Sequence, residues 1–176
     1  MKLQCVKSEL ANALQIVSKA VATKPQTPIL SGIYLKASEG VLELQATNYE
    51  IGIIARIDAD IEEPGEIAIS GRYFQEVVRS LPRDNVKLIF SREENILHIN
   101  SNQANFTLVS MNAAEFPTVK ELAGDLQFTV KDNVLRGLIK KTAFACATDD
   151  GRPVFTGCSL DISDTKVTMA ATNTHR

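Results

Sequence analysis

The fold of this chain is decided by residues 20–48, AVATKPQTPILSGIYLKASEGVLELQATN, which return at residues 145–173 as ACATDDGRPVFTGCSLDISDTKVTMAATN. Aligned without a gap at an offset of 125 residues, the two stretches share ten identities in 29 positions. Average residue usage would give roughly two identities over such a length. Self-similarity at a fixed spacing indicates a structural unit that occurs more than once. The chain is therefore predicted to hold two copies of one unit.

Periodicity on either side of the repeat predicts a few helices among many short strands. One helix is expected to begin at Ser8, whose hydroxyl can cap it, and to carry apolar residues at helical spacing as far as Val21. Two more are expected over residues 72–81 and from Asp132 to Phe144. A few helices among strands joined by tight turns predict an α+β fold with antiparallel sheets. The expected strands cover residues 1–6, 29–35, 41–46, 51–57, 66–70, 86–90, 96–100, 106–111, 128–130, 155–161 and 166–171.

Composition and cysteine usage indicate a globular, cytoplasmic protein. Of its 176 residues, 44% are hydrophobic and 23% are charged, a balance typical of folded domains. No apolar run approaches the roughly 18 to 20 residues that a membrane-spanning helix needs, and the first residues do not resemble a secretory signal. Cys5, Cys146 and Cys158 are odd in number and lack a C-x-x-C spacing, so they are interpreted as small core residues.

The second copy of the unit is shorter than the first. It begins near residue 125, and the sequence stops at Arg176, less than halfway through the 125-residue period. Half a unit would leave a sheet edge unpaired and a core face bare. We therefore expect the natural chain to continue beyond Arg176.

Six short motifs, taken together, make the chain resemble a known family. They are MKL (1–3), SKAV (18–21), TPILSG (27–32), ATNYE (46–50), AAEFP (113–117) and ATNTHR (171–176). In this combination the chain is similar to the bacterial DNA polymerase III β sliding clamps over its whole length. The family usually has Thr-Asp-Gly-His-Arg where residues 172–176 here read TNTHR.

The resemblance implies both a fold and a function. Clamps of this family have three similar domains per chain, and two chains close head to tail into a ring with antiparallel sheets outside and helices facing a DNA hole. The resemblance assigns residues 1–121 to clamp domain 1 and residues 122–176 to an incomplete clamp domain 2, with domain 3 absent from this chain. It implies a homodimeric processivity factor of the bacterial replicative DNA polymerase. Its implied partners are duplex DNA, and the DNA polymerase III catalytic subunit and clamp loader, which bind through short linear peptides.

Charge placement agrees with a DNA-binding surface. The three helical windows 8–24, 71–83 and 131–146 hold nine basic and three acidic residues, so they carry a net charge of +6 within a chain of net charge −2. Such segregation suits loose contact with phosphates, which carry no sequence information. The alternative is solvated helix faces, since Lys and Arg are favoured near helix C-termini. The candidate DNA-binding residues, with Lys24 first by its match to the family, are Lys24, Arg72, Arg79, Arg83, Arg136, Lys140 and Lys141.

Positions that differ between the two copies are the better candidates for a binding site, because shared residues are explained by the common fold. Arg152 stands where the first copy has Thr27, and Phe155 stands where it has Leu30. By the resemblance, these positions line a groove in which clamp loaders and polymerases dock a short peptide. A core phenylalanine beside surface charges is the alternative. The predicted partner-peptide pocket consists of Arg152, Phe155, Thr172, Thr174, His175 and Arg176.

Phe106 and Leu108 share one face of the strand expected at residues 106–111. The resemblance implies that this strand edge forms the dimer interface, against the third domain of the other protomer. An edge covered in that way would be protected from unwanted pairing. The alternative is an ordinary core face, which the sequence alone favours.

The sequence contains no motif for catalysis. It lacks the G-x-x-x-x-G-K-[ST], G-x-S-x-G and H-E-x-x-H patterns. Asp149 and Asp150 with His175 could be imagined as an acid–base or metal site, but adjacent aspartates in a Gly-Arg-Pro turn are more often turn residues. We therefore expect a non-catalytic accessory subunit without metal or cofactor. A peptide-binding scaffold of clamp-like domains that does not bind DNA is the alternative function.

Overall fold

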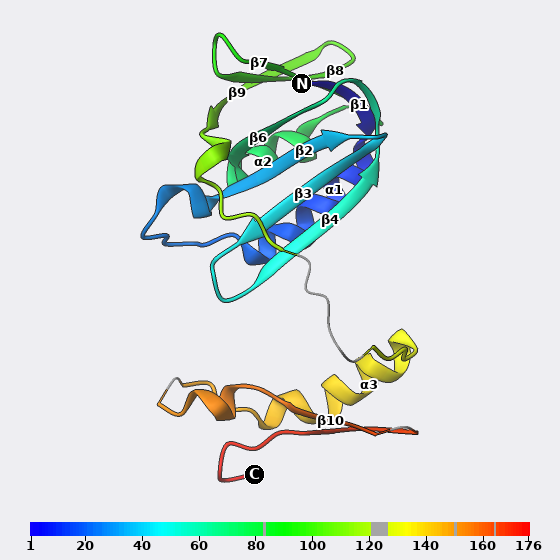
Figure 1. Ribbon diagram of the computed structural model, residues 1–176, viewed down its shortest axis with the longest axis vertical. Coiled ribbons are helices and arrows are strands. Elements are labelled where there is room, and N and C mark those ends of the chain that lie inside the picture. The colour runs from blue at the N-terminus through cyan, green and yellow to red at the C-terminus, as the bar shows by residue number, and fades with distance from the viewer. Residues whose placement is uncertain (83, 121–126, 150, 164) are drawn as a thin grey trace. The chain divides into compact units, whose positions relative to one another are not determined.

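The computed structural model describes residues 1–82, 84–120, 127–149, 151–163 and 165–176 (Figure 1). The backbone forms two compact units, Met1–Glu121 and Leu122–Arg176. Among the described residues, no helix is long and apolar enough to cross a membrane.

The first unit is built on a nine-stranded antiparallel sheet with the order β4-β3-β2-β6-β9-β8-β7-β1-β5. Strands β6 and β9 are joined by two residue pairs, Ala68 with Met111 and Ile69 with Ser110. The sheet therefore consists of two leaves, β4-β3-β2-β6 and β9-β8-β7-β1-β5, that meet at a narrow seam. The strands are β1 Lys2–Val6, β2 Gly32–Ser38, β3 Val41–Thr47, β4 Gly52–Asp58, β5 Asp60–Glu63, β6 Gly65–Ser70, β7 Asn85–Ser91, β8 Ile96–Ser101 and β9 Ala104–Met111.

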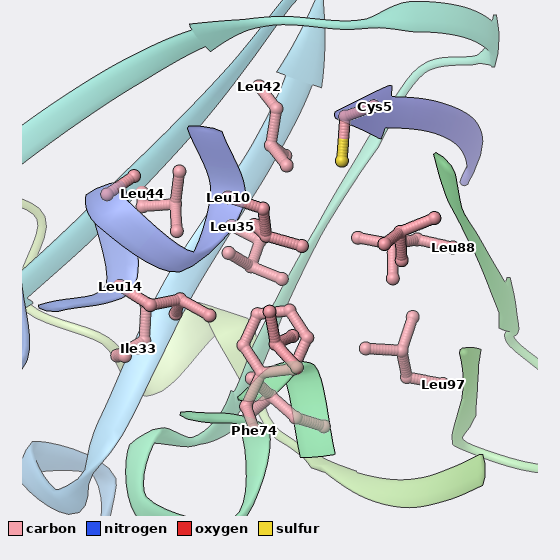
Figure 2. Packing of buried hydrophobic residues seen from close by; sticks show 14 of the residues in the cluster. Cys5, Leu10, Leu14, Ile33, Leu35, Leu42, Leu44, Phe74, Leu88 and Leu97 are labelled. Atoms are coloured by element: carbon pink, nitrogen blue, oxygen red, sulfur yellow. The ribbon is translucent and has the colours of Figure 1, made fainter. Parts of the chain in front are cut away.

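Two helices, α1 (Lys7–Val17) and α2 (Gly71–Ser80), pack against each other and share one hydrophobic core with both leaves. Figure 2 shows side chains from the two helices and from strands of both leaves pointing into a common space. Burial of each such side chain stabilises the fold by about 1.5–3 kcal/mol. The residues labelled there are Cys5, Leu10, Leu14, Ile33, Leu35, Leu42, Leu44, Phe74, Leu88 and Leu97.

The N-terminus of α1 differs from the prediction. The helix begins at Lys7, and the preceding Val6 offers no side-chain cap, so the capping role predicted for Ser8 is wrong. Strand β1 runs directly into the helix, and the backbone N–H of Lys7 donates to the carbonyl oxygen of Asp84 at 2.5 Å. A neighbouring loop thus satisfies one of the free N–H groups that a cap would otherwise serve.

The described helices and strands of the second unit follow those of the first at the offset of 125 residues, except that the residues equivalent to β1 form no strand. Helix α3 (Asp132–Thr142) corresponds to α1, and the hairpin of β10 (Ser159–Ser163) with β11 (Lys166–Ala170) corresponds to that of β2 with β3. Even the strand register is kept, because the pairs Tyr34–Gln45 and Ser159–Ala170 are equivalent. The repeat seen in the sequence is therefore a repeat of the backbone.

The α+β class with antiparallel sheets is confirmed, and several boundaries are corrected. Residues 128–130 do not form the predicted strand, and the short strand β5 was not predicted. The strands expected from residues 29 and 155 begin later, because the 3-10 helices Pro28–Ser31 and Pro153–Thr156 precede them. Proline fixes φ near the helical value and suits the first position of such a turn.

Candidate partner-peptide pocket, basic residues and open strand edge

A pocket of about 510 Å³ opens in the second unit between two segments. One segment is the loop between α3 and β10, and the other follows β11. Both segments lie outside the β-strands, in connecting regions that are typical positions for binding residues on a rigid scaffold. The residues that line the pocket are Cys146, Ala147, Thr148, Asp149, Gly151, Arg152, Phe155, Asn173, Thr174, His175 and Arg176.

Backbone hydrogen bonds hold the first wall of the pocket. The N–H of Ala147 donates to the carbonyl oxygen of Phe155 at 2.8 Å, and the N–H of Phe155 donates to that of Arg152 at 3.0 Å. The first copy has the same two bonds. The N–H of Ala22 donates to the carbonyl oxygen of Leu30 at 3.0 Å, and the N–H of Leu30 donates to that of Thr27 at 3.1 Å. The loop thus keeps the inherited backbone and changes the side chains that it presents.

Side chains of the Thr172–Arg176 turn shape the second wall. The hydroxyl of Thr172 accepts from the N–H of Thr174 at 3.1 Å and donates to the carbonyl oxygen of Arg176 at 2.7 Å. The Asn173 side-chain oxygen accepts the N–H groups of His175 and Arg176, each at 3.1 Å. Thr174 has a φ of 74°, a left-handed conformation that costs a non-glycine residue roughly 1–2 kcal/mol. The sequence resemblance places glycine at this position in the family.

A smaller apolar groove of about 290 Å³ lies beside the pocket, and Phe155 lines both. Thr172 lines the smaller groove, together with Val154 and Gly157. Five of the six residues predicted for the peptide pocket therefore lie together around the larger cavity, and the sixth lies in the adjacent groove. Their role in peptide binding remains a prediction.

Sequence reasoning missed part of the lining, including Cys146, Ala147, Thr148 and Asn173. Most of these positions are shared between the copies, so the comparison of copies that found Phe155 passed them over.

The acid–base alternative finds little support in the geometry. Asp149 and His175 both line the pocket, but the Asp149 carboxylate accepts the N–H of Gly151 at 3.2 Å, as a turn residue does. Asp150 lies outside the described residues. Within the part of the chain that the structure describes, no three His, Cys, Asp or Glu side chains gather as metal ligands would.

The basic candidates of the first unit are exposed on or beside its helices. Lys24 lies in the loop after α1, and Arg72 and Arg79 lie on α2. Arg72 approaches Glu76 at 3.2 Å, and its guanidinium carbon lies 5.9 Å from the ring centroid of Tyr73. Arg83 lies outside the described residues.

The basic candidates of the second unit lie on α3. Arg136, Lys140 and Lys141 are all exposed, and Arg136 approaches Asp132 at 3.8 Å. Exposed pairs of this kind contribute about 0–1 kcal/mol. Such pairs leave the cations available for other anions.

The predicted interface strand β9 has partly buried and exposed faces. Phe106 and Leu108 pack against the main core, as the alternative interpretation expected, whereas Val109 is 71% exposed. Residues 104–109 pair with β8 on one side, and β6 pairs with β9 only at Ser110 and Met111. Among the described strands, none pairs with residues 104–109 on the side away from β8, so this edge is open.

Solved structures that resemble this chain are sliding clamps. The DNA polymerase sliding clamp of Bacillus subtilis matches with a TM-score of 0.93 and 28% identity, over 99% of this chain and 48% of that chain. The DNA polymerase III subunit beta of Pseudomonas aeruginosa matches with a TM-score of 0.90 and 31% identity, over 99% and 47%. The protein therefore has the DNA clamp fold, as predicted.

The sequence comparisons narrow this class to one family. Residues 1–120 match the family model of the DNA polymerase III beta subunit, N-terminal domain, and residues 129–176 match that of its central domain. The "Beta sliding clamp" of Streptomyces coelicolor is 30% identical to this chain, and the match covers all of this chain and 46% of that protein. The "Beta sliding clamp" of Vibrio cholerae is 32% identical, and the match covers 100% of this chain and 48% of that protein. The chain spans about half the length of the curated relatives it matches. It belongs to the DNA polymerase III beta subunit family.

Proposed function

We propose that this chain is the N-terminal part of a sliding clamp, a ring that encircles duplex DNA and keeps the bacterial replicative polymerase on its template. The observation that carries the proposal is the succession of two family domains, with the pocket inside the second. In this assignment residues 1–121 are clamp domain 1, residues 122–176 are part of domain 2, and a third domain completes each half of the ring. The protein acts in the cytoplasm and catalyses no reaction of its own.

The exposed basic residues of the helices hold the DNA in this proposal. Neutralising phosphates releases counterions, so such contact is independent of sequence and weakens steeply with salt. Few strong contacts are needed, because a closed ring stays on DNA by topology rather than affinity. The residues assigned to this surface are Lys24, Arg72, Arg79, Arg83, Arg136, Lys140 and Lys141.

The pocket of the second unit takes a short linear peptide of the polymerase III catalytic subunit or of the clamp loader. Phe155 supplies an apolar wall shared by the pocket and the groove, while Arg152, His175 and Arg176 supply polar groups at the pocket. An apolar wall with a few polar groups suits recognition of an extended peptide. Thr172 and Thr174 hold the turn that carries His175.

The open edge of β9 is the surface through which two chains close the ring. A partner strand added along residues 104–109 would satisfy the free backbone groups of this edge. Phe106 and Leu108 position the strand from the core side, and the exposed Val109 faces away from that core.

The decisive experiment is loading of the complete protein onto nicked circular DNA by a clamp loader, followed by linearisation of the circle. A ring stays on the circle and is released when the DNA is cut. Retention that is indifferent to cutting contradicts the ring, and failure to load while peptide binding persists favours the DNA-independent scaffold.

Polymerase stimulation in the same assay separates the pocket from the ring. Phe155→Ala is expected to stay on circular DNA yet lose at least about tenfold of its affinity for the polymerase, the effect of losing about 1.4 kcal/mol at a central contact. Phe144→Ala is the matched control, because Phe144 is 65% exposed and lines neither cavity. Equal loss in both variants would count against the pocket.

A further inference from the structure

Two of the three cysteines meet in the second unit. The Sγ atoms of Cys146 and Cys158 are 3.6 Å apart, although the sequence shows no C-x-x-C motif. Cys146 directly follows the 3-10 helix Ala143–Ala145, and Cys158 directly precedes β10. A disulfide bond is about 2.05 Å long. The two sulfur atoms are therefore neighbours that need only approach each other further to bond.

The first copy of the repeat shows which residues stand at the positions of the two cysteines. The equivalent residues of the first copy are Val21 and Ile33, which lie together beside Gly71, since a Cβ placed there would meet a methyl of each at 3.2 Å. Two apolar residues that pack beside the same glycine are thus both cysteines in the second copy. Free cysteine behaves as a small hydrophobic residue, so the cysteines keep the apolar character of this position. Only the dithiol can be cross-linked.

The segment between the two cysteines is the first wall of the pocket. It contains Asp149, Gly151, Arg152 and Phe155, all of which line the cavity. The hydrogen bond from Ala147 to Phe155 already ties the base of this loop at 2.8 Å. A bond between the sulfur atoms would close the same loop as a covalent ring.

We propose that Cys146 and Cys158 form a modification site, at which exchange with a low-molecular-weight disulfide such as oxidised glutathione produces an intramolecular disulfide. One protein thiolate attacks a sulfur of the small disulfide, breaks its S–S bond and releases one small thiol. The second protein thiolate then attacks the protein sulfur of the mixed disulfide and releases the other small thiol. Two protein thiols are oxidised, the small disulfide is reduced to two thiols, and the balance is complete. The proposal does not depend on the proposed clamp function.

The surroundings of the three cysteines set the order of reaction. Cys158 is exposed and is the site of the first attack, whereas Cys146 is partly buried and resolves the mixed disulfide. Desolvation, followed by the hydrogen bond with Cys158, raises the pKa of Cys146 above its ordinary value. The resolving step therefore accelerates as the pH rises. Cys5 is buried in the first unit, and burial raises its pKa to about 12, so it stays a thiol.

The test equilibrates the folded protein with mixtures of oxidised and reduced glutathione, traps remaining thiols by alkylation after acid quenching, and measures the mass. The expected product has lost two hydrogens and carries one alkylated cysteine. Chymotrypsin cleaves after Phe155, between the two cysteines, and the two fragments should stay joined until a reductant is added. Cys5→Ser should oxidise like the unmodified protein.

The chain offers a matched control in the double variant Cys146→Val and Cys158→Ile, which restores the residues of the first copy and should be indifferent to the redox buffer. The equilibrium constant for disulfide formation in the folded protein should also exceed that in urea by at least about tenfold, because folding holds the thiols together. Three alkylated cysteines at every glutathione ratio would overturn the proposal. So would stable mixed disulfides, or a constant no higher than in urea.

Discussion

The two copies of the repeated unit have the same backbone and different burial. Leu35 of the first copy is 0% exposed, whereas the equivalent Leu160 is 42% exposed. Ile29 is 3% exposed, and its counterpart Val154 is 80% exposed. The hairpin that carries each leucine nevertheless has the same register. Backbone geometry in this unit is thus determined by nearby sequence, while burial depends on what packs over it.

The covering elements of the first copy explain the difference. Strands β1, β6, β7 and β8 and helix α2 all contribute side chains to the core around α1 and the β2–β3 hairpin. In the second unit, the described elements are limited to α3, the β10–β11 hairpin and three-residue to four-residue 3-10 helices. The same helix and hairpin are therefore stabilised by much more side-chain packing in the first copy than in the second.

The largest expected effect compares identical residues in the two copies. Leu35→Ala should lower the free energy of unfolding of the first unit by about 2–5 kcal/mol, because it opens a cavity in a closed core. Leu160→Ala should cost less than about 1 kcal/mol, because nearly half of the residue is already in water. Hydrogen exchange measured by mass spectrometry follows each unit separately. Equal losses at the two positions would break the comparison.

A smaller effect is expected from the threonine that shapes the turn in each copy. The Thr47 hydroxyl accepts from the N–H of Tyr49 at 3.1 Å and donates to the carbonyl oxygen of Ile51 at 2.8 Å, as Thr172 does in its own turn. Thr47→Val should cost about 1–3 kcal/mol, because buried polar groups lose their partner. Thr172→Val should cost about 0.5–1.5 kcal/mol, since water can replace the hydroxyl. Urea unfolding of both variants tests the order, and a larger loss at Thr172 would reverse it.

The smallest expected effect is an acid sensitivity confined to the first copy. Burial acts to raise the pKa of Glu43, but hydrogen bonds from Gln45 and Arg56, each at 2.7 Å, more than offset it and hold the pKa below the ordinary value of 4.5. Because the pKa of Glu43 is lower in the folded protein than in the unfolded chain, ionised Glu43 stabilises the fold at pH values above the unfolded pKa. This stabilisation is lost as the pH falls through the folded pKa. In Glu43→Gln the acid-dependent fall in the free energy of unfolding should be smaller by less than about 1 kcal/mol, because Arg56 is half exposed.

The measurement is urea unfolding at neutral pH and at steps below pH 4.5. The equivalent residue of the second copy is Thr168, which cannot titrate, so Thr168→Ala serves as the control. An unchanged acid profile in Glu43→Gln would show that other carboxyl groups carry the sensitivity.

Local signals in the sequence predicted most of the fold, and contacts between distant residues produced the exceptions. Helical periodicity located α3, because its hydrogen bonds join residues only a few positions apart. The N-terminus of α1 was misplaced because Lys7 is satisfied by Asp84, far along the chain. The strand expected at residues 128–130 had the right alternation, but the structure gives it no partner strand among the described residues.

The candidate sites also divide into those that local sequence marks and those that contacts between distant residues form. Phe155 and Arg152 could be found because they depart from the first copy at positions where the backbone does not. The cysteine pair could not be found, because it depends on how a loop packs on the start of β10. Val109 was also missed, since alternation marked Phe106 and Leu108 and said nothing of which strand edge stays open.

The narrow seam in the nine-stranded sheet has a mechanical consequence. Strands β6 and β9 share two residue pairs, whereas β2 with β6 and β8 with β9 share six each. The fewest hydrogen bonds resist bending at this seam, and the chain also links the two leaves through Ala59, between β4 and β5. The apolar core that both leaves share packs across the seam and holds the two leaves together.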